Sequence, residues 1–287
     1  MSATHGKRLA REVGDVYIFV LFNIMEATAL LHLGEWQRLQ QQTTEALVMA
    51  EKNANRPARA LCKLTFAWLH VEAMDFQGAC EFCQAVDDTI LEENPFAFYF
   101  HHAVLAKAFV GLNDRQRALK QIEDVQRRVD AEGTGLDFTI YTQFYHCFGE
   151  YCLLVGDIAQ ARTRAIQLRD YVASAPDRNH LALAYALLAR IALAAGEADD
   201  AQAQLSAALA TLDNADFPLA AWRIYLAAAE IWESLGDSSK AAEYRGNFET
   251  VMRTLAQNFD AEDRLRSSLL AAVETRRGGS GARRAAS

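Results

Sequence analysis

Cysteine and histidine residues form the clusters in this sequence whose types and spacing could support chemistry. Cys80 and Cys83 make a Cys-x-x-Cys pair, and on a helix this spacing places both thiols on one face. A structural zinc site needs four ligands, and no second pair stands at a suitable spacing. Cys83 also falls at a position where the repeats described below carry mostly core residues. We therefore interpret the pair as packing residues and predict no metal site.

A second cluster places Cys147 next to His146, with Cys152 one turn further on. A catalytic cysteine needs a base that faces the thiol and a third group that orients the base. Adjacent residues on a helix point about 100° apart, so His146 and Cys147 do not face each other. The sequence also contains no phosphate-binding loop, nucleophile elbow or paired-carboxylate site. We predict a protein that is not an enzyme and that needs no cofactor.

The elements that position these residues follow from an internal repeat. A short hinge before an alanine-rich helix occurs six times, at spacings of 39 to 43 residues. A fixed period in this range predicts a solenoid of stacked helical hairpins. The first residues of the hinges are Gly34, Met74, Asn113, Gly156, Gly196 and Gly236.

Two further positions keep their distance from each hinge and carry small residues. Seven residues before the hinge stand Ala27, Ala67, Ala106, Gly149, Ala189 and Ala229. Five residues after it stand Leu39, Ala79, Ala118, Ala161, Ala201 and Ala241. Small side chains at both points let the two helices of a hairpin pack closely. The hinge glycine or asparagine supplies a left-handed turn, and the acidic residue that follows it can cap the second helix. The prolines Pro57, Pro95, Pro176 and Pro218 all fall between repeats, where proline is tolerated.

These patterns predict an all-α, right-handed superhelical solenoid of six helix–turn–helix repeats over residues 14–275. We expect first helices near residues 14–33, 57–73, 95–111, 137–155, 177–195 and 218–235. We expect second helices near residues 36–53, 76–92, 115–131, 158–174, 198–212 and 238–257, with a capping helix near 261–274. Residues 1–13 are predicted to be an N-terminal extension, and residues 276–287 a disordered basic tail.

The charge balance bears on the choice of partner. The formal net charge is −8, and the tail contributes four arginines and no acid. Without them the body has 25 basic and 37 acidic residues, a charge of −12, which disfavours nucleic-acid binding. The apolar run Val16 to Met25 is too short to span a bilayer, so we predict no membrane association. An odd number of cysteines without a secreted framework favours a cytoplasmic location.

The repeat resembles the tetratricopeptide repeat, in which a glycine–acid pair precedes an alanine and a small residue lies seven positions upstream. The period of about 40 residues departs from the usual ~34. Stretched repeats of this kind resemble the C-terminal helical domains of bacterial signalling ATPases, of the maltose-regulon activator type and the type linked to nucleotide cyclases. The segment from Asp263 to Leu270 is similar to the end of the cyclase-linked chains. Because this chain lacks their ATPase loop and a DNA-binding helix–turn–helix, the resemblance implies only a regulatory, partner-binding role.

A column of polar residues marks the expected binding surface. Six residues before each hinge stand Thr28, Trp68, Lys107, Glu150, Arg190 and Glu230. The resemblance implies that this position lines the concave groove of the superhelix. Gln143, His146 and Arg223 fall in nearby groove positions. The charges could bind a protein or peptide partner, or they could pair with one another as an internal ladder. A second hypothesis for function is a sensor that binds a short peptide or small molecule in the groove.

The first helix carries an apolar run, from Val16 to Phe22, on every side. Packing against its hairpin partner would bury only about half of it. We therefore predict an exposed apolar patch that includes Phe19 and Phe22. Such a patch would bind a second copy of the chain or another protein.

Overall fold

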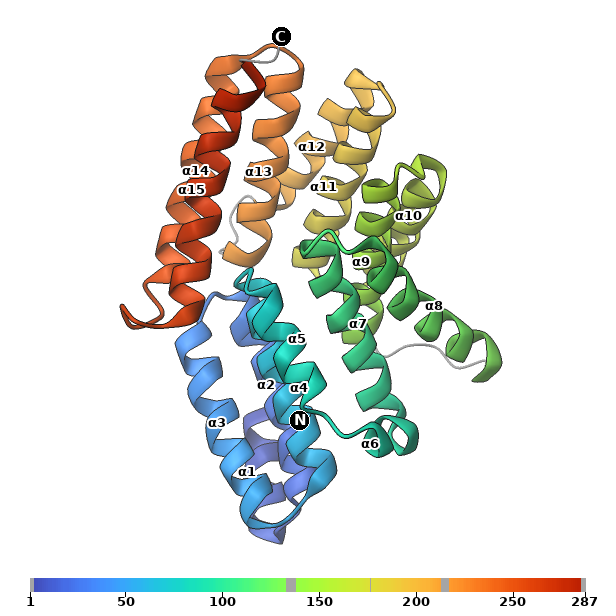
Figure 1. The fold of residues 1–287 in the computed structure, drawn as a ribbon, viewed down its shortest axis with the longest axis vertical. Coiled ribbons are helices and arrows are strands. Elements are labelled where there is room, and N and C mark those ends of the chain that lie inside the picture. The colour runs from blue at the N-terminus through green and yellow to red at the C-terminus, as the bar shows by residue number, and fades with distance from the viewer. Residues whose placement is uncertain (1–2, 133–137, 176, 213–216, 285–287) are drawn as a thin grey trace.

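The six repeats each fold into a helical hairpin (Figure 1). The computed structural model describes residues 3–132, 138–175, 177–212 and 217–284, and in these residues the regular structure is entirely helical. The first helices are α2 (Val16–His32), α4 (Arg56–Glu72), α7 (Pro95–Gly111), α9 (Phe138–Val155), α11 (Arg178–Ala194) and α13 (Pro218–Ser234). The second helices are α3 (Trp36–Lys52), α5 (Phe76–Gln84), α8 (Arg115–Glu132), α10 (Ile158–Ala173), α12 (Ala198–Leu212) and α14 (Ser238–Ala256). With α15 (Arg264–Arg284) closing the array, the predicted all-α solenoid is confirmed.

The hinges have the backbone conformation that their residues predict. All six have a positive φ, between 56° at Asn113 and 83° at Gly236. Four of the acidic residues that follow, Asp75, Asp114, Asp157 and Asp237, accept a hydrogen bond from the backbone N–H three residues later. The hinge therefore ends one helix and caps the next at these four repeats.

The small residues on either side of each hinge are buried, as the spacing predicts. Ala161 and Ala201, for example, have no exposed surface. Pro57, Pro95 and Pro218 lie in the first turns of α4, α7 and α13, whereas Pro176 lies outside the described residues. The buried small residues, unlike the prolines, lie between the two helices of each hairpin and let them pack closely.

The second repeat departs from the expected single helix over residues 76–92. Its second half is split into α5 and the short α6 (Asp88–Glu93). Asp87 interrupts the helix because its carboxylate accepts a hydrogen bond from the Thr89 N–H and pairs with Arg56, so it acts as a helix cap.

The residues expected to be an extension form another helix, α1 (Ala3–Val13), which packs on α2. The prediction of an exposed patch at Phe19 and Phe22 is wrong. Phe19 is 3% exposed and lies under the Lys7 and Arg11 side chains, while Gly6 packs directly on the Phe22 ring. Because α1 covers this face, the reason for proposing self-association through it is removed.

The other terminus also differs from its prediction. The backbone of α15 continues through Arg284, so residues 276–284 are helical where a disordered tail was expected. The stretch contains glycines but no proline, and glycine weakens a helix without blocking it. The last three residues of the predicted tail, 285–287, lie outside the described residues.

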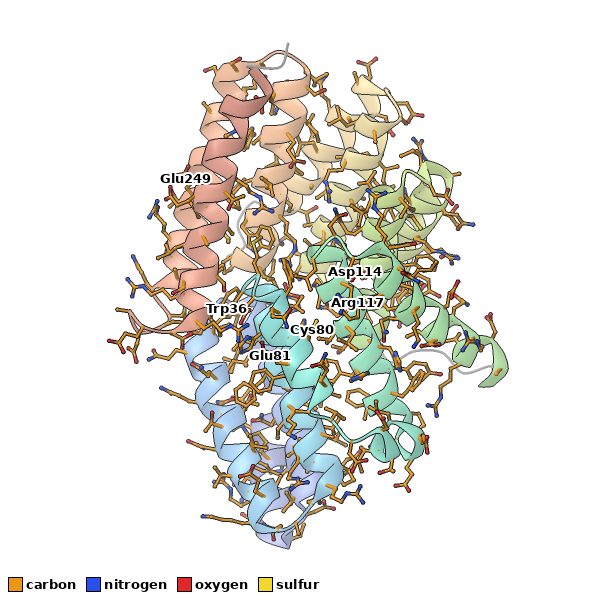
Figure 2. All side chains as sticks on the ribbon, in the orientation of Figure 1. Trp36, Cys80, Glu81, Asp114, Arg117 and Glu249 are labelled. Carbon is orange, nitrogen blue, oxygen red and sulfur yellow. The ribbon has the colours of Figure 1, made fainter. Side chains whose placement is uncertain are left out.

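The array closes on itself, which was not predicted. Each first helix contacts the next, and α13, the last, contacts α2, the first (Figure 1). The Trp36 backbone N–H donates to Asn258 Oδ1 at 3.1 Å, and the Trp36 ring packs on Phe259 where the first hairpin meets the last (Figure 2). A Cβ on Gly34 would lie 2.7 Å from Pro218 Cγ, so this approach requires glycine.

Helix α15 adds a second set of contacts across the closure. Arg264 Nε lies 2.7 Å from Asp75 Oδ2, and its Nη1 donates to Glu81 Oε2 at 2.8 Å. Both carboxylates belong to the second repeat, so the end of the chain is tied to its beginning. The six first helices therefore form a closed ring.

None of the helices in the described ranges has both the length and the apolar character needed to cross a membrane.

Candidate functional site

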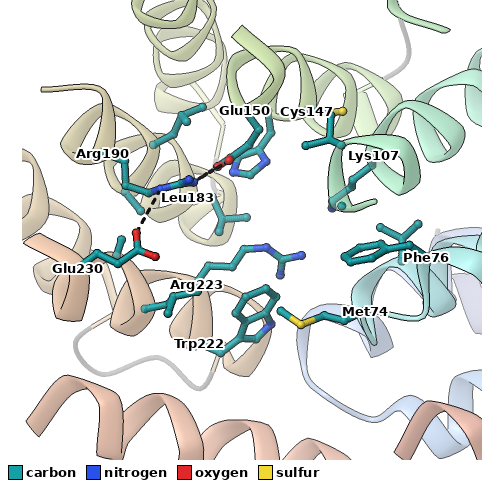
Figure 3. Close-up of a pocket in the computed structure, with 18 of the residues that line it drawn as sticks. Met74, Phe76, Lys107, Cys147, Glu150, Leu183, Arg190, Trp222, Arg223 and Glu230 are labelled. Atoms are coloured by element: carbon teal, nitrogen blue, oxygen red, sulfur yellow. Dashed lines mark hydrogen bonds and ion pairs between the residues drawn. The ribbon is translucent and has the colours of Figure 1, made fainter. Parts of the chain in front are cut away.

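The ring of first helices encloses a cavity of about 230 Å³, which we call the central cavity (Figure 3). Its walls come from α4, the hinge between α4 and α5, the start of α5, α7, α9, α11, α13 and α15. It therefore joins the second repeat to the sixth repeat and α15, and it depends on closure of the ring.

Most of the residues expected to line an open groove meet at this cavity. Lys107, His146, Glu150, Arg190, Arg223 and Glu230 line it. The other two lie deeper in the wall. Trp68 is only 2% exposed, and Gln143 Oε1 accepts a hydrogen bond from Lys107 Nζ at 3.0 Å. Closure of the ring narrows the expected concave groove to a cavity that stays open to solvent on one side, where the Glu230 side chain is 55% exposed.

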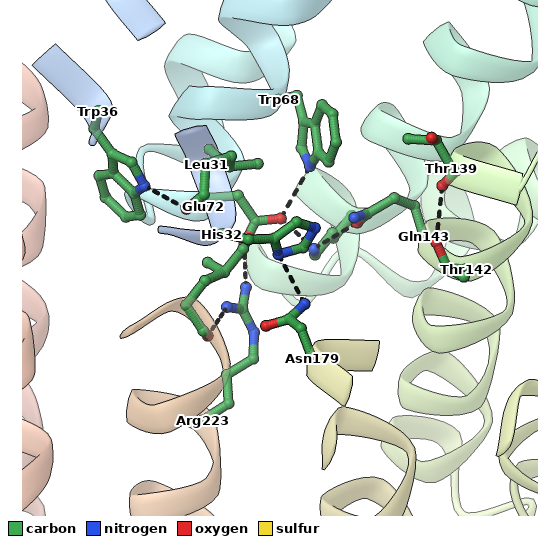
Figure 4. Close-up of polar contacts among 12 residues, drawn as sticks. Leu31, His32, Trp36, Trp68, Glu72, Thr139, Thr142, Gln143, Asn179 and Arg223 are labelled. Carbon is green, nitrogen blue, oxygen red and sulfur yellow. Dashed lines mark hydrogen bonds and ion pairs between the residues drawn. The ribbon is translucent and has the colours of Figure 1, made fainter. Parts of the chain in front are cut away.

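Glu72 is the centre of the polar network in the wall (Figure 4). Its side chain is 1% exposed, and it pairs with Lys107 from α7 and, at 2.5 Å, with Arg223 Nη2 from α13. The Trp68 indole N–H donates to the same carboxylate at 3.2 Å. Burial alone would raise the pKa of Glu72, but the Arg223 and Lys107 charges outweigh it and hold the pKa well below its usual value.

A second ion-pair group spans the repeats on the other side of the cavity. Arg190 Nη1 donates to both carboxylate oxygens of Glu150, at 2.5 and 2.6 Å, and Arg190 Nε lies 3.9 Å from Glu230. Burial would raise the pKa of Glu150, but the nearby Arg190 lowers it below its usual value. These contacts form a charge ladder between successive first helices, one of the two alternatives considered from the sequence.

The cysteine and histidine at the cavity are not poised for catalysis. Burial raises the pKa of Cys147 to about 12 and lowers that of His146 to about 3. At neutral pH the thiol therefore stays protonated, and the imidazole is neutral and a poor base. Cys80 and Cys83 are likewise free, buried thiols. Within the described residues, no group of three or more His, Cys, Asp or Glu side chains could hold a metal ion.

Three important residues were missed from the sequence. Glu72 lies four residues after Trp68 and therefore on the same face of the helix. This spacing is the one sequence feature that connects Glu72 with the predicted column. Trp222 and Arg276 also line the cavity. Arg276 falls in the segment expected to be disordered, because Gly-Gly-Ser-Gly follows shortly after it.

The fold is similar to that of a solved signalling protein. The structure aligns with a Signal Transduction ATPase with Numerous Domains (STAND) that has a tetratricopeptide repeat sensor, from Pyrococcus horikoshii, with a TM-score of 0.52. Sequence identity is 13%, and the alignment covers 92% of this chain and 47% of that protein. The chain thus spans about half the length of its structural neighbour. No protein-family model matches the sequence, and no curated protein does. The likeness establishes a tetratricopeptide-like helical repeat fold.

Proposed function

We propose that this protein is a non-catalytic regulatory module that binds a small molecule, or the end of a short peptide, in the central cavity. The observation that carries this proposal is the closure of the ring. An α-helix with its side chains is about 10–12 Å across, and a cavity of about 230 Å³ has no room for one. A small ligand is therefore favoured over a folded partner as the occupant of this site.

The similarity to a signalling ATPase supports the regulatory part of the proposal. In that ATPase the tetratricopeptide repeats form a sensor. We propose that the present chain has the corresponding role in a larger signalling system, of the kind represented by the maltose-regulon activators and the cyclase-linked ATPases. In such a role, ligand binding in the cavity would change how tightly the first and last hairpins are held together.

A cavity-filling variant tests this function. Leu226 lines the central cavity, so Leu226→Trp should fill it, whereas Leu112→Trp adds the same side chain at an exposed position outside it. In a thermal-shift screen of metabolites and short peptides, a true ligand should stabilise the wild type and Leu112→Trp. At about a hundredfold excess over Kd the gain is ~2.7 kcal/mol, or roughly 5–10 °C. Leu226→Trp should show no such gain.

A ligand that stabilises all three proteins equally binds elsewhere and contradicts the proposal. So does a broad library from which no compound stabilises the wild type.

A further inference from the structure

One wall of the central cavity has hydrogen-bond donors without matching acceptors. The Trp222 indole Nε1 is buried and has no hydrogen-bond partner among the described residues, and Trp222 is 5% exposed. Arg276 forms no ion pair with any carboxylate in the described part of the chain. Its Nη1 instead lies 3.8 Å from the Met74 Sδ, and a thioether sulfur is only a weak acceptor. Figure 3 shows Trp222 and Met74 side by side on this wall.

Arg223 adds a third donor group at the same place. Its guanidinium stacks over the Trp222 ring, 4.0 Å from the ring centroid. It donates to Glu72 and to the Leu219 carbonyl oxygen, and a guanidinium carries five N–H donors, so further donors remain. We call the group of Trp222, Arg223 and Arg276 around Met74 the donor corner.

The charges around the cavity also leave a positive surplus. Lys107, Arg190, Arg223 and Arg276 line it, against the lining acids Glu150 and Glu230 and the adjoining Glu72. Four cations and three carboxylates give a net charge of +1, because His146 is neutral. Glu72 is shared by Lys107 and Arg223, so the surplus lies at that pair, whereas Glu150 and Glu230 share Arg190 and the Glu230 charge also acts on Arg276. A positive cavity in a protein of net charge −8 favours an anion over a neutral or cationic ligand.

Met74 occupies the place where an acceptor would fit. It is the only hinge residue that is neither glycine nor asparagine, and its φ of 62° costs a side chain of this kind about 1–2 kcal/mol. Its flexible side chain lines the central cavity beside the donor corner. A methionine can change rotamer at little cost and so vacate this position.

Resting on the function proposed above, we propose that the central cavity binds a small organic acid. Its carboxylate lies at the donor corner, in place of the Met74 thioether, and its apolar body packs on Phe76, Leu226 and the neighbouring aliphatic wall. Arginine and carboxylate form paired, charge-assisted hydrogen bonds, which suits Arg276 and Arg223. A cavity of 150 Å³ can hold benzene, so this one has room for an aromatic acid of about ten non-hydrogen atoms.

Calorimetric titration with matched probes tests this assignment. Benzoate and phenylacetate are the acids, and benzamide and benzylamine keep the ring but remove or reverse the charge. We expect the acids to bind and the amide and amine to bind at least tenfold more weakly. Arg276→Met should weaken phenylacetate binding at least tenfold, about 1.4 kcal/mol. Arg276 and Arg253 are both exposed arginines, but Arg253 lies outside the cavity, so the control Arg253→Met should leave the affinity unchanged. Met74→Gly should bind phenylacetate more tightly.

Three results would overturn the assignment. Benzamide binding as tightly as benzoate would show that charge is not recognised, although the cavity would remain a ligand site and the proposed function would stand. Inorganic phosphate binding as tightly as phenylacetate would show that the apolar wall is not used. If neither the wild type nor Met74→Gly binds the acids, an organic acid is ruled out as the ligand. The failure of the proposed function is seen separately, in the Leu226→Trp comparison.

Discussion

Replacing Glu72 with glutamine is expected to lower the free energy of unfolding by about 3–5 kcal/mol. Glu72 is the shared counter-ion of Lys107 and Arg223, whose side chains are 17% and 15% exposed. Glutamine keeps the shape and can still accept the Trp68 hydrogen bond, but it leaves two mostly buried cations without a negative partner. Denaturant unfolding of the wild type and the variant measures the loss.

The same pair of proteins has a predicted pH dependence. The pKa of Glu72 is lower in the folded protein than its reference value of 4.5. Its stabilisation is therefore complete above about pH 4.5 and is lost as the pH falls through the folded pKa. The stability difference between wild type and Glu72→Gln should be constant from neutral pH down to about pH 5 and should shrink in more acidic solution.

A matched control separates this effect from a general loss of charge. Glu233→Gln removes a carboxylate from α13 that pairs with Arg245, but both side chains are substantially exposed, at 48% and 31%. Exposed ion pairs contribute about 0–1 kcal/mol. If Glu72→Gln costs no more than Glu233→Gln, the network around Glu72 does not stabilise the ring.

The second large effect is expected at the point of closure. Gly34→Ala places a Cβ 2.7 Å from Pro218 Cγ and 3.0 Å from Leu255 Cδ2, at a residue with φ of 74°. Gly196→Ala is the matched control, because its φ is 78° and a Cβ there meets nothing within 4 Å. In both variants, alanine in the left-handed backbone conformation lowers the free energy of unfolding by about 1–2 kcal/mol. Gly34→Ala should lose a further 1–3 kcal/mol or so by overpacking.

Small-angle scattering gives an independent measurement of the same pair. Gly34→Ala should have a larger radius of gyration than Gly196→Ala, because its first and last hairpins are forced apart. Equal stability and equal size in the two variants would mean that the hairpins do not touch at Gly34.

The local structure was largely predictable because it depends on short-range chemistry. A hinge of glycine or asparagine before an acidic residue specifies a left-handed turn and a helix cap whatever the rest of the chain does. Even Met74, the least suitable residue, adopts the positive φ that its position requires. Asp87 shows the limit of this reasoning, because its capping bonds split a helix that the repeat period alone would continue.

Closure of the ring could not be predicted from the repeat. It depends on the small angle between each hairpin and the next, which accumulates over six repeats and is not encoded at any single residue. The error at Phe19 has a different cause, because residues 1–13 lie outside the repeat and the helix that they form, α1, covers the apolar face.

The candidate site was predictable only in part. The column that contains Glu150, Arg190 and Glu230 joins neighbouring repeats, so equal spacing from the hinge brings these residues together. The Glu72–Arg223 pair joins residues 151 positions apart, and its formation requires the ring to close. Arg276 reaches the cavity for the same reason, from a helix beyond the last repeat.

The most direct test of the closed ring is therefore a double-mutant cycle between Glu72 and Arg223. The free energies of unfolding of the wild type, Glu72→Gln, Arg223→Met and the double variant give the coupling between the second and sixth repeats. A closed ring predicts a coupling of at least about 1 kcal/mol, as for residues in direct contact. In an open superhelix the two residues would be far apart, and the effects of the two substitutions would add to within ~0.5 kcal/mol. That additive result would contradict both the ring and the central cavity it encloses.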